Sequence, residues 1–110
     1  MTPAPGLMLC DDLIFFSRVS GFARAAGLEV RRTRTPADLV SAARANPPKG
    51  VILDLHNPGL DLPALLDELR AACGGELPRV IAYGSHVEAK VLSAARQAGC
   101  DRVMPRSQFV

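Results

Sequence analysis

Residues 51–58 read VILDLHNP, and this stretch decides the fold. Three consecutive aliphatic residues are typical of a short strand that is buried on both faces, as in a parallel sheet covered by helices. The run breaks at Asp54, continues to His56, and stops at a proline. A buried carboxylate without a partner is costly. We therefore expect Asp54 to lie where the strand leaves the core and enters a polar pocket.

Short apolar runs alternate with amphipathic segments along the whole chain, which is the pattern of parallel strands joined by crossover helices. Four helices are expected between five strands. The strands are predicted at residues 7–10, 28–32, 51–54, 80–83 and 102–104. Right-handed crossovers between them predict an α/β, doubly wound, five-stranded parallel sheet. The flavodoxin-like order 2-1-3-4-5, which we expect here, is one of the two common orders of such sheets.

Helix boundaries are indicated by capping residues. The pair Thr35-Pro36 and the residue Asp61 are typical of helix starts, and Gly27 is typical of a helix end. The first helix is predicted from residue 12 to 26. Its expected buried face spans about 120° at 3.6 residues per turn and holds Phe15, Phe16, Val19, Phe22, Ala23 and Ala26.

Length and composition indicate one domain over residues 1–110. Hydrophobic residues make up 48% of the chain and charged residues 22%, as in ordinary globular proteins. The first residues lack the features of a signal peptide and no apolar stretch is long enough to span a membrane, so a soluble cytoplasmic protein is expected.

Charge and cysteine content exclude other classes of site. The net charge of +2 does not indicate nucleic-acid binding. The run RRTR at residues 31–34 is interpreted as a solvated strand end, with a partner or phosphate contact as the alternative. The three cysteines have no CxxC spacing, so they indicate neither a disulfide framework nor zinc, and we expect small buried side chains.

Three carboxylates are predicted at one edge of the sheet. Asp11 and Asp12 follow the first strand, Asp54 ends the third, and the order 2-1-3 makes these strands neighbours. Like charges held close together repel unless a cation neutralises them, and Mg²⁺ prefers oxygen ligands. The alternative is that Asp11 or Asp12 only caps the first helix.

Four segments resemble the signatures of response-regulator receiver domains (CheY-like): LMLCDD, ILDLHNPGLD, RVIAYGS and AGCDRVMPRS. The resemblance covers nearly the whole chain. It implies that Asp11 and Asp12 hold Mg²⁺ and that Asp54 accepts a phosphoryl group from a histidine kinase. It also implies that the backbone carbonyl of His56 faces the metal, with the imidazole over the mouth of the pocket; the alternative is that His56 is an ordinary histidine of a surface loop.

Other positions depart from the receiver pattern. Gly84 stands where a Ser or Thr is usual, with Ser85 one residue late, and Arg106 replaces the usual lysine. Arginine is not interchangeable with a compact ammonium group. Val103 stands in place of the usual aromatic residue. These departures indicate an atypical receiver, or pseudo-receiver, in which the residues that report phosphorylation are changed.

Receivers also have a fifth helix, for which the 110 residues leave no room. We therefore expect one sheet face to be partly uncovered and to form a homodimer, bordered by the first helix and the end Phe109-Val110; the alternative is a piece cut from a longer protein. The expected function is signalling through protein contacts without catalysis. The alternatives are a small flavodoxin-like domain that binds a nucleotide or phosphate ligand, and a hydrolase or transferase.

Overall fold

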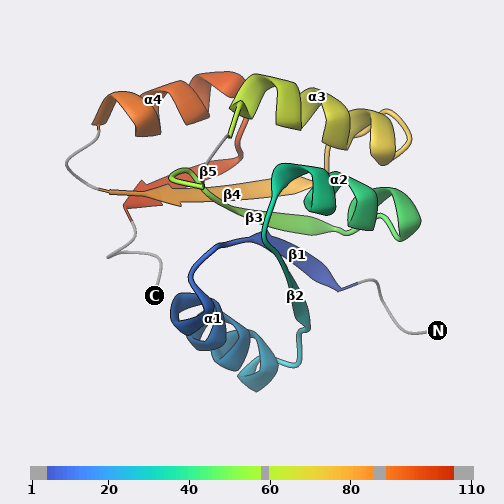
Figure 1. The fold of residues 1–110 in the computed structure, drawn as a ribbon, viewed down its shortest axis with the longest axis vertical. Helices are drawn as coiled ribbons and strands as arrows, with labels where there is room; N and C mark the ends of the chain where they lie inside the picture. Colours follow the sequence, from blue (N-terminus) through green and yellow to red (C-terminus); the bar gives the residue numbers. More distant parts are fainter. Residues whose placement is uncertain (1–4, 58–59, 86–88, 106–110) are drawn as a thin grey trace.

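The computed structural model describes residues 5–57, 60–85 and 89–105. Strands and helices alternate along the chain, as Figure 1 shows. The strands are β1 (Gly6–Leu9), β2 (Val30–Thr33), β3 (Gly50–Asp54), β4 (Arg79–Gly84) and β5 (Arg102–Pro105). The helices are α1 (Leu13–Ala25), α2 (Pro36–Ala45), α3 (Leu62–Ala72) and α4 (Ala89–Ala98).

All five strands pair in parallel in one sheet of order β2-β1-β3-β4-β5. The predicted α/β sheet and its order are therefore confirmed. The expectation of a missing fifth helix concerns the end of the chain, where residues 106–110 lie outside the described part. No helix in the described ranges is long and apolar enough to cross a membrane.

The starts of α2 and α3 follow the predicted capping residues, Thr35 and Asp61, and α1 is capped by Asp12. The side chains of Asp12, Thr35 and Asp61 each accept a hydrogen bond from the backbone N–H three residues further on, which satisfies a donor that has no partner inside the helix. After α1, Gly27 adopts a φ of 79°, a left-handed conformation that costs glycine little. Local side-chain chemistry thus sets where three of the helices begin.

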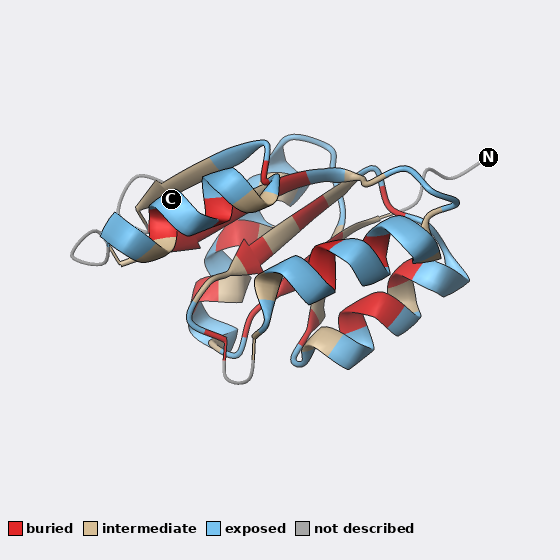
Figure 2. Ribbon diagram, turned by 90° about the horizontal axis from the view of Figure 1, so that it is seen from above, coloured by how far each residue is buried: buried red, intermediate tan, exposed pale blue. Residues whose placement is uncertain are grey.

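The two faces of the sheet are covered unequally. Helices α2, α3 and α4 lie on one face and α1 lies alone on the other (Figure 1). The helices carry their buried residues on the side toward the sheet (Figure 2). The larger core, under α2, α3 and α4, holds Leu7, Leu9, Leu39, Val40, Ala43, Val51, Leu53, Leu65, Leu66, Leu69, Val80, Ala82, Ala95 and Cys100. The smaller core, under α1, holds Met8, Cys10, Phe15, Val19 and Tyr83.

One prediction about α1 is wrong. Phe22 and Ala26 were expected in its buried face, but Phe22 is 67% exposed, and Ala26 is exposed and lies just beyond the end of the helix. The first turns of α1 rest on large side chains such as Tyr83, whereas its end lies near Gly6 and Gly50, which have no side chains to pack against it. A helical pattern identifies the inward face of a helix but does not show how far the surface beneath it extends.

Two of the three cysteines are buried, as expected, and the third is not. All three are free thiols, with Cys10 and Cys100 buried and Cys73 half-buried.

Candidate functional site

The candidate site lies at the carboxyl edge of the sheet, where β1 and β3 end side by side. Cys10, Asp11 and Asp12 follow β1, and Asp54 is the last residue of β3. From β1 the chain continues to β2 on one side of the sheet, and from β3 it continues to β4 and β5 on the other side. The boundary between β1 and β3 is therefore a topological switch point, where doubly wound sheets bind their ligands. The topology therefore brings together the chain segments that carry the three predicted acids.

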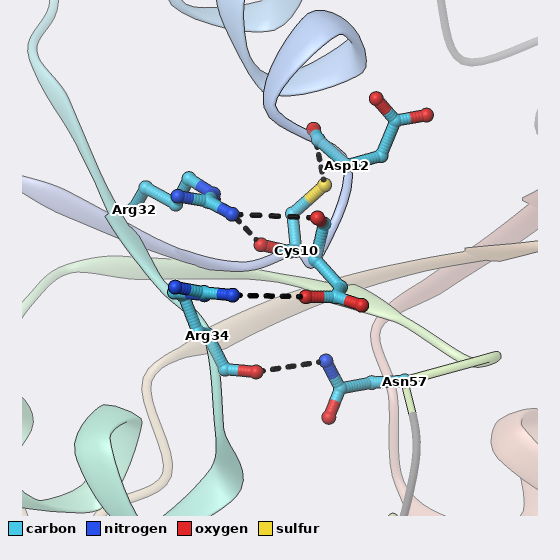
Figure 3. A network of polar contacts seen from close by, with 6 residues as sticks. Cys10, Asp12, Arg32, Arg34 and Asn57 are labelled. Atoms are coloured by element: carbon cyan, nitrogen blue, oxygen red, sulfur yellow. Dashed lines mark hydrogen bonds and ion pairs between the residues drawn. The ribbon is translucent and has the colours of Figure 1, made fainter.

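Asp12 acts as a helix cap in this structure. One of its carboxylate oxygens, Oδ1, accepts a hydrogen bond of 3.0 Å from the backbone N–H of Phe15. In Figure 3 the carboxylate of Asp12 points away from Arg32, Arg34 and Asn57. The alternative that one of the two acids after β1 caps the first helix therefore applies to Asp12.

Asp11 faces an arginine instead. Its Oδ1 lies 3.9 Å from Nη2 of Arg34, and the two side chains are 54% and 69% exposed. An ion pair this exposed is worth at most about 1 kcal/mol. It nevertheless places a guanidinium beside Asp11, where the sequence predicted a metal ion.

The run RRTR is not simply a solvated strand end. The Nε of Arg32 donates a hydrogen bond of 2.9 Å to the carbonyl of Cys10, and its Nη2 donates one of 3.3 Å to the carbonyl of Asp11. Together with Arg34, it reaches over the turn that follows β1 (Figure 3). Only Arg31 of the three arginines stays with its sequence neighbour Glu29, 3.5 Å away. The solvated interpretation is wrong for Arg32, because pairing of β1 with β2 brings this turn within its reach.

Asp54 is linked to the end of β4 through His56. One carboxylate oxygen of Asp54 accepts a hydrogen bond of 2.9 Å from the backbone N–H of His56. The imidazole Nε2 of His56 in turn accepts one of 2.9 Å from the backbone N–H of Ser85. Since Nε2 accepts, the neutral ring carries its proton on Nδ1.

The same imidazole occupies the space in front of Gly84. A Cβ atom at Gly84 would lie 3.3 Å from Nε2 of His56 and 3.3 Å from Cδ2 of Leu92, closer than most such contacts. A hydroxyl-bearing side chain at this position would meet the imidazole. Gly84 and His56 are therefore sterically coupled, which the sequence did not reveal.

Two other buried residues escaped the sequence analysis. Asn57 is 5% exposed, and its Nδ2 donates a hydrogen bond of 3.0 Å to the carbonyl of Arg34, which ties the end of β3 to the loop after β2 (Figure 3). Tyr83 is 1% exposed, packs against Phe15 with ring centroids 5.0 Å apart, and donates its hydroxyl to Sγ of Cys10 at 3.4 Å. Neither carries a sequence signal beyond residue type, because both roles depend on distant segments.

The predicted acids fit a hard cation in their chemistry, since carboxylate oxygens are the ligands that Mg²⁺ prefers. Within the described ranges, however, no group of three or more His, Cys, Asp or Glu residues is placed to hold a metal ion. Asp12 is engaged in its cap and Asp11 faces Arg34. Arg106 and the loop residues Pro58 and Gly59 lie outside the described part. The metal site therefore remains a prediction.

Val103, which replaces the usual aromatic residue, is half-buried and packs against the larger core.

Comparison with known proteins gives structural relatives only. No family model and no curated protein matches the sequence. The receiver domain of NtrX from Brucella abortus is 25% identical with a TM-score of 0.79, over 92% of this chain and 84% of that chain. A response regulator from Burkholderia pseudomallei with a phosphorylated aspartic acid, calcium ion and citrate is 17% identical with a TM-score of 0.77, over 93% and 59%.

A third match is the co-crystal structure of the Saccharomyces cerevisiae histidine phosphotransfer protein Ypd1 and the receiver domain of its downstream response regulator Ssk1. It is 14% identical with a TM-score of 0.75, over 96% of this chain and 81% of that chain. The chain thus has the fold of a response-regulator receiver domain. The Burkholderia pseudomallei structure contains a phosphorylated aspartic acid and a calcium ion, and the Ssk1 receiver domain was crystallised together with Ypd1.

Proposed function

We propose that this chain is a signalling receiver module in which Asp54 accepts a phosphoryl group from a histidine kinase or a histidine phosphotransfer protein. The observation that carries the proposal is the position of Asp54, which ends the central strand of a receiver-type sheet beside the turn that holds Asp11. The phosphorylated aspartate of the Burkholderia pseudomallei neighbour supports the chemistry, and the Ypd1 and Ssk1 pair supports the class of partner.

The proposed transfer needs no other nucleophile. A carboxylate oxygen of Asp54 attacks the phosphorus of a phosphohistidine, an O–P bond forms, and the N–P bond breaks with its electron pair returning to the imidazole nitrogen. Bound Mg²⁺ would supply positive charge for the phosphoryl oxygens and would be held by Asp11, Asp12, Asp54 and the backbone carbonyl of His56.

The state of Asp54 would be read by an atypical route. Gly84 offers no hydroxyl, and Val103 is no aromatic switch. The hydrogen bonds from His56 to Asp54 and from Ser85 to His56 instead connect the acceptor to the end of β4. A phosphoryl group on Asp54 changes the carboxylate that accepts the hydrogen bond from the backbone N–H of His56. We therefore assign His56 the reporting role, which makes the chain a receiver of atypical type.

The output is proposed to be a protein contact without catalysis. The homodimer expected from the sequence, and the cytoplasmic location, stay predictions.

The test is incubation with a small phosphodonor and Mg²⁺, followed by intact-mass measurement. A mass increase of one phosphoryl group is expected, and Asp54→Asn should abolish it. Asp67→Asn is the matched control, because Asp67 is an exposed aspartate on α3 that pairs with Arg70 of the same helix. Beryllofluoride with Mg²⁺, followed by amide NMR, should shift the signals of His56 and Ser85. Absence of modification together with absence of any Mg²⁺-dependent change at the acids would overturn the proposal.

A further inference from the structure

A groove of about 780 Å³ opens on the α1 face of the sheet, at the amino ends of the strands. The half-buried side chains of Ile52 and Ile81 and the backbone of Gly6 and Gly50 line it, and Leu28, 65% exposed, borders it. We call it the amino-edge groove. It lies at the opposite end of the strands from the candidate site, so the chemistry proposed there does not account for it.

Among the residues that the structure describes, the helix layer over the amino-edge groove is incomplete. Parallel sheets normally have helices on both faces. Here α1 packs its buried face on Met8, Cys10 and Tyr83, and leaves Ile52 and Ile81 half-exposed. An added strand cannot fill the space, because the backbone groups of β1, β3 and β4 already pair with one another. The occupant that completes this face is a helix with one apolar side.

The rim of the groove is basic. The exposed side chains of Arg24, Lys49 and Arg79 border it, and within the described ranges none of the three forms an ion pair. The acidic residue of the rim, Glu29, lies 3.5 Å from Arg31, which offsets its charge. The uncompensated positive charge favours an occupant with acidic flanks.

We propose that the amino-edge groove docks an amphipathic helix of another protein, with apolar residues toward the sheet and Asp or Glu along its flanks. A second copy of this chain fits less well. Its α1 is the helix with exposed apolar residues, Ile14 and Phe22, and it carries Arg18 and Arg24 but no acidic residue. Two copies facing each other here would bring basic rims together. This inference goes beyond the proposed phosphorylation and does not depend on it.

The probe is a fluorescent helical peptide of roughly 18 residues, about five turns, with leucines at helical spacing and glutamates on both flanks. A matched peptide has lysines in place of the glutamates. Anisotropy titration against the whole chain should show about tenfold tighter binding of the acidic peptide at low salt, and this preference should shrink as salt screens the rim. Amide NMR should place the shifts at the amino ends of β3 and β4.

Filling the floor of the groove should abolish binding. Gly50→Val adds a side chain suited to a strand, and a Cβ there would meet only a backbone oxygen at an ordinary 3.8 Å. We expect an unchanged or higher melting temperature and at least roughly tenfold weaker binding of the acidic peptide. Lys49→Glu, at the exposed rim, is a second variant that leaves the floor intact and should reduce the preference for glutamate.

Other outcomes would overturn the inference. If the acidic and basic peptides bind equally well, the groove does not select an acidic helix. If the acidic peptide still binds to folded Gly50→Val, it does not bind in the groove. Self-association that Gly50→Val abolishes would assign the groove to a second copy, and competition by a fatty acid that binds more tightly would assign it to a lipid. Asp54→Asn should not change peptide binding, which separates this test from that of the proposed function.

Discussion

The two faces of the sheet are built from the same five strands, yet they are packed to different extents. Under α2, α3 and α4, side chains such as Leu53 and Val80 are completely buried. Under α1, the next residues along the same strands, Ile52 and Ile81, are only half-buried. Because successive strand residues point to opposite faces, the difference reflects the number of helices on each face and not the composition of the strands.

The difference in packing suggests that one face of the sheet mainly stabilises the fold and that the other is free to contact other molecules. The larger core lies on the face with three helices, where most of the apolar area is removed from water. The face with α1 retains the amino-edge groove and the exposed side chains of Ile14 and Phe22. We therefore expect substitutions on the first face to act on folding and those on the second face to act on binding.

The largest expected effect compares neighbours in β3. Leu53→Ala removes a side chain that is 0% exposed in the larger core, and it should lower the free energy of unfolding by about 2–5 kcal/mol. Ile52→Ala removes a side chain that water already reaches, and it should cost clearly less. Urea denaturation of both variants measures the difference. Equal losses would show that the α1 face is as well packed as the other.

An intermediate effect concerns Cys100, in the larger core. Burial, and then the charge of Asp101, raises the pKa of its thiol from 9.0 to about 11. Between these two pH values the thiol of Cys100 loses its proton in the unfolded chain but keeps it in the folded protein. The free energy of unfolding is therefore unaffected by this group below about pH 9 and falls as the pH rises toward 11. The loss is at most about 3 kcal/mol.

Chemical denaturation across this pH range tests the effect, with Cys100→Ala as the comparison. The variant should show a shallower fall of stability than the parent protein. If the free energy of unfolding depends on pH with the same slope in both proteins, then groups other than Cys100 cause the loss of stability at high pH.

The smallest expected effect lies on the α1 face. Asp12→Ala removes the carboxylate that accepts a hydrogen bond from the backbone N–H of Phe15. It should lower the free energy of unfolding by about 1 kcal/mol, measured by thermal denaturation without Mg²⁺. Asp12→Asn should retain most of the stability. Asp11→Ala should change little, since its ion pair with Arg34 is exposed. A larger loss for Asp11→Ala than for Asp12→Ala would reverse the assignment of the cap.

Local signals made much of the fold predictable. The apolar run before Asp54 predicted β3, and capping residues such as Thr35 and Asp61 predicted where their helices begin. The convergence at one edge of the two segments that carry the three acids followed from strand order. These features depend on residues close in sequence, or on topological rules that hold for any parallel sheet.

Details of the site were not predictable in the same way. Arg32 contacts the Cys10 carbonyl, Asn57 the Arg34 carbonyl, and the Ser85 N–H the His56 ring. Each contact joins segments about 20 to 30 residues apart, and it exists only because particular strands are paired.

From the sequence alone we could predict the alternation of strands and helices, a doubly wound parallel sheet and a strand that ends at Asp54, because periodicity, capping and crossover handedness are properties of the chain. The strand order that the structure shows is one of the two that these properties commonly give. Only the tertiary structure decided that Asp12 caps α1, that His56 fills the space before Gly84, and that the glycine floor beneath the end of α1 leaves a groove. These outcomes depend on distances between loops and on how far one surface extends over another, which no local pattern specifies.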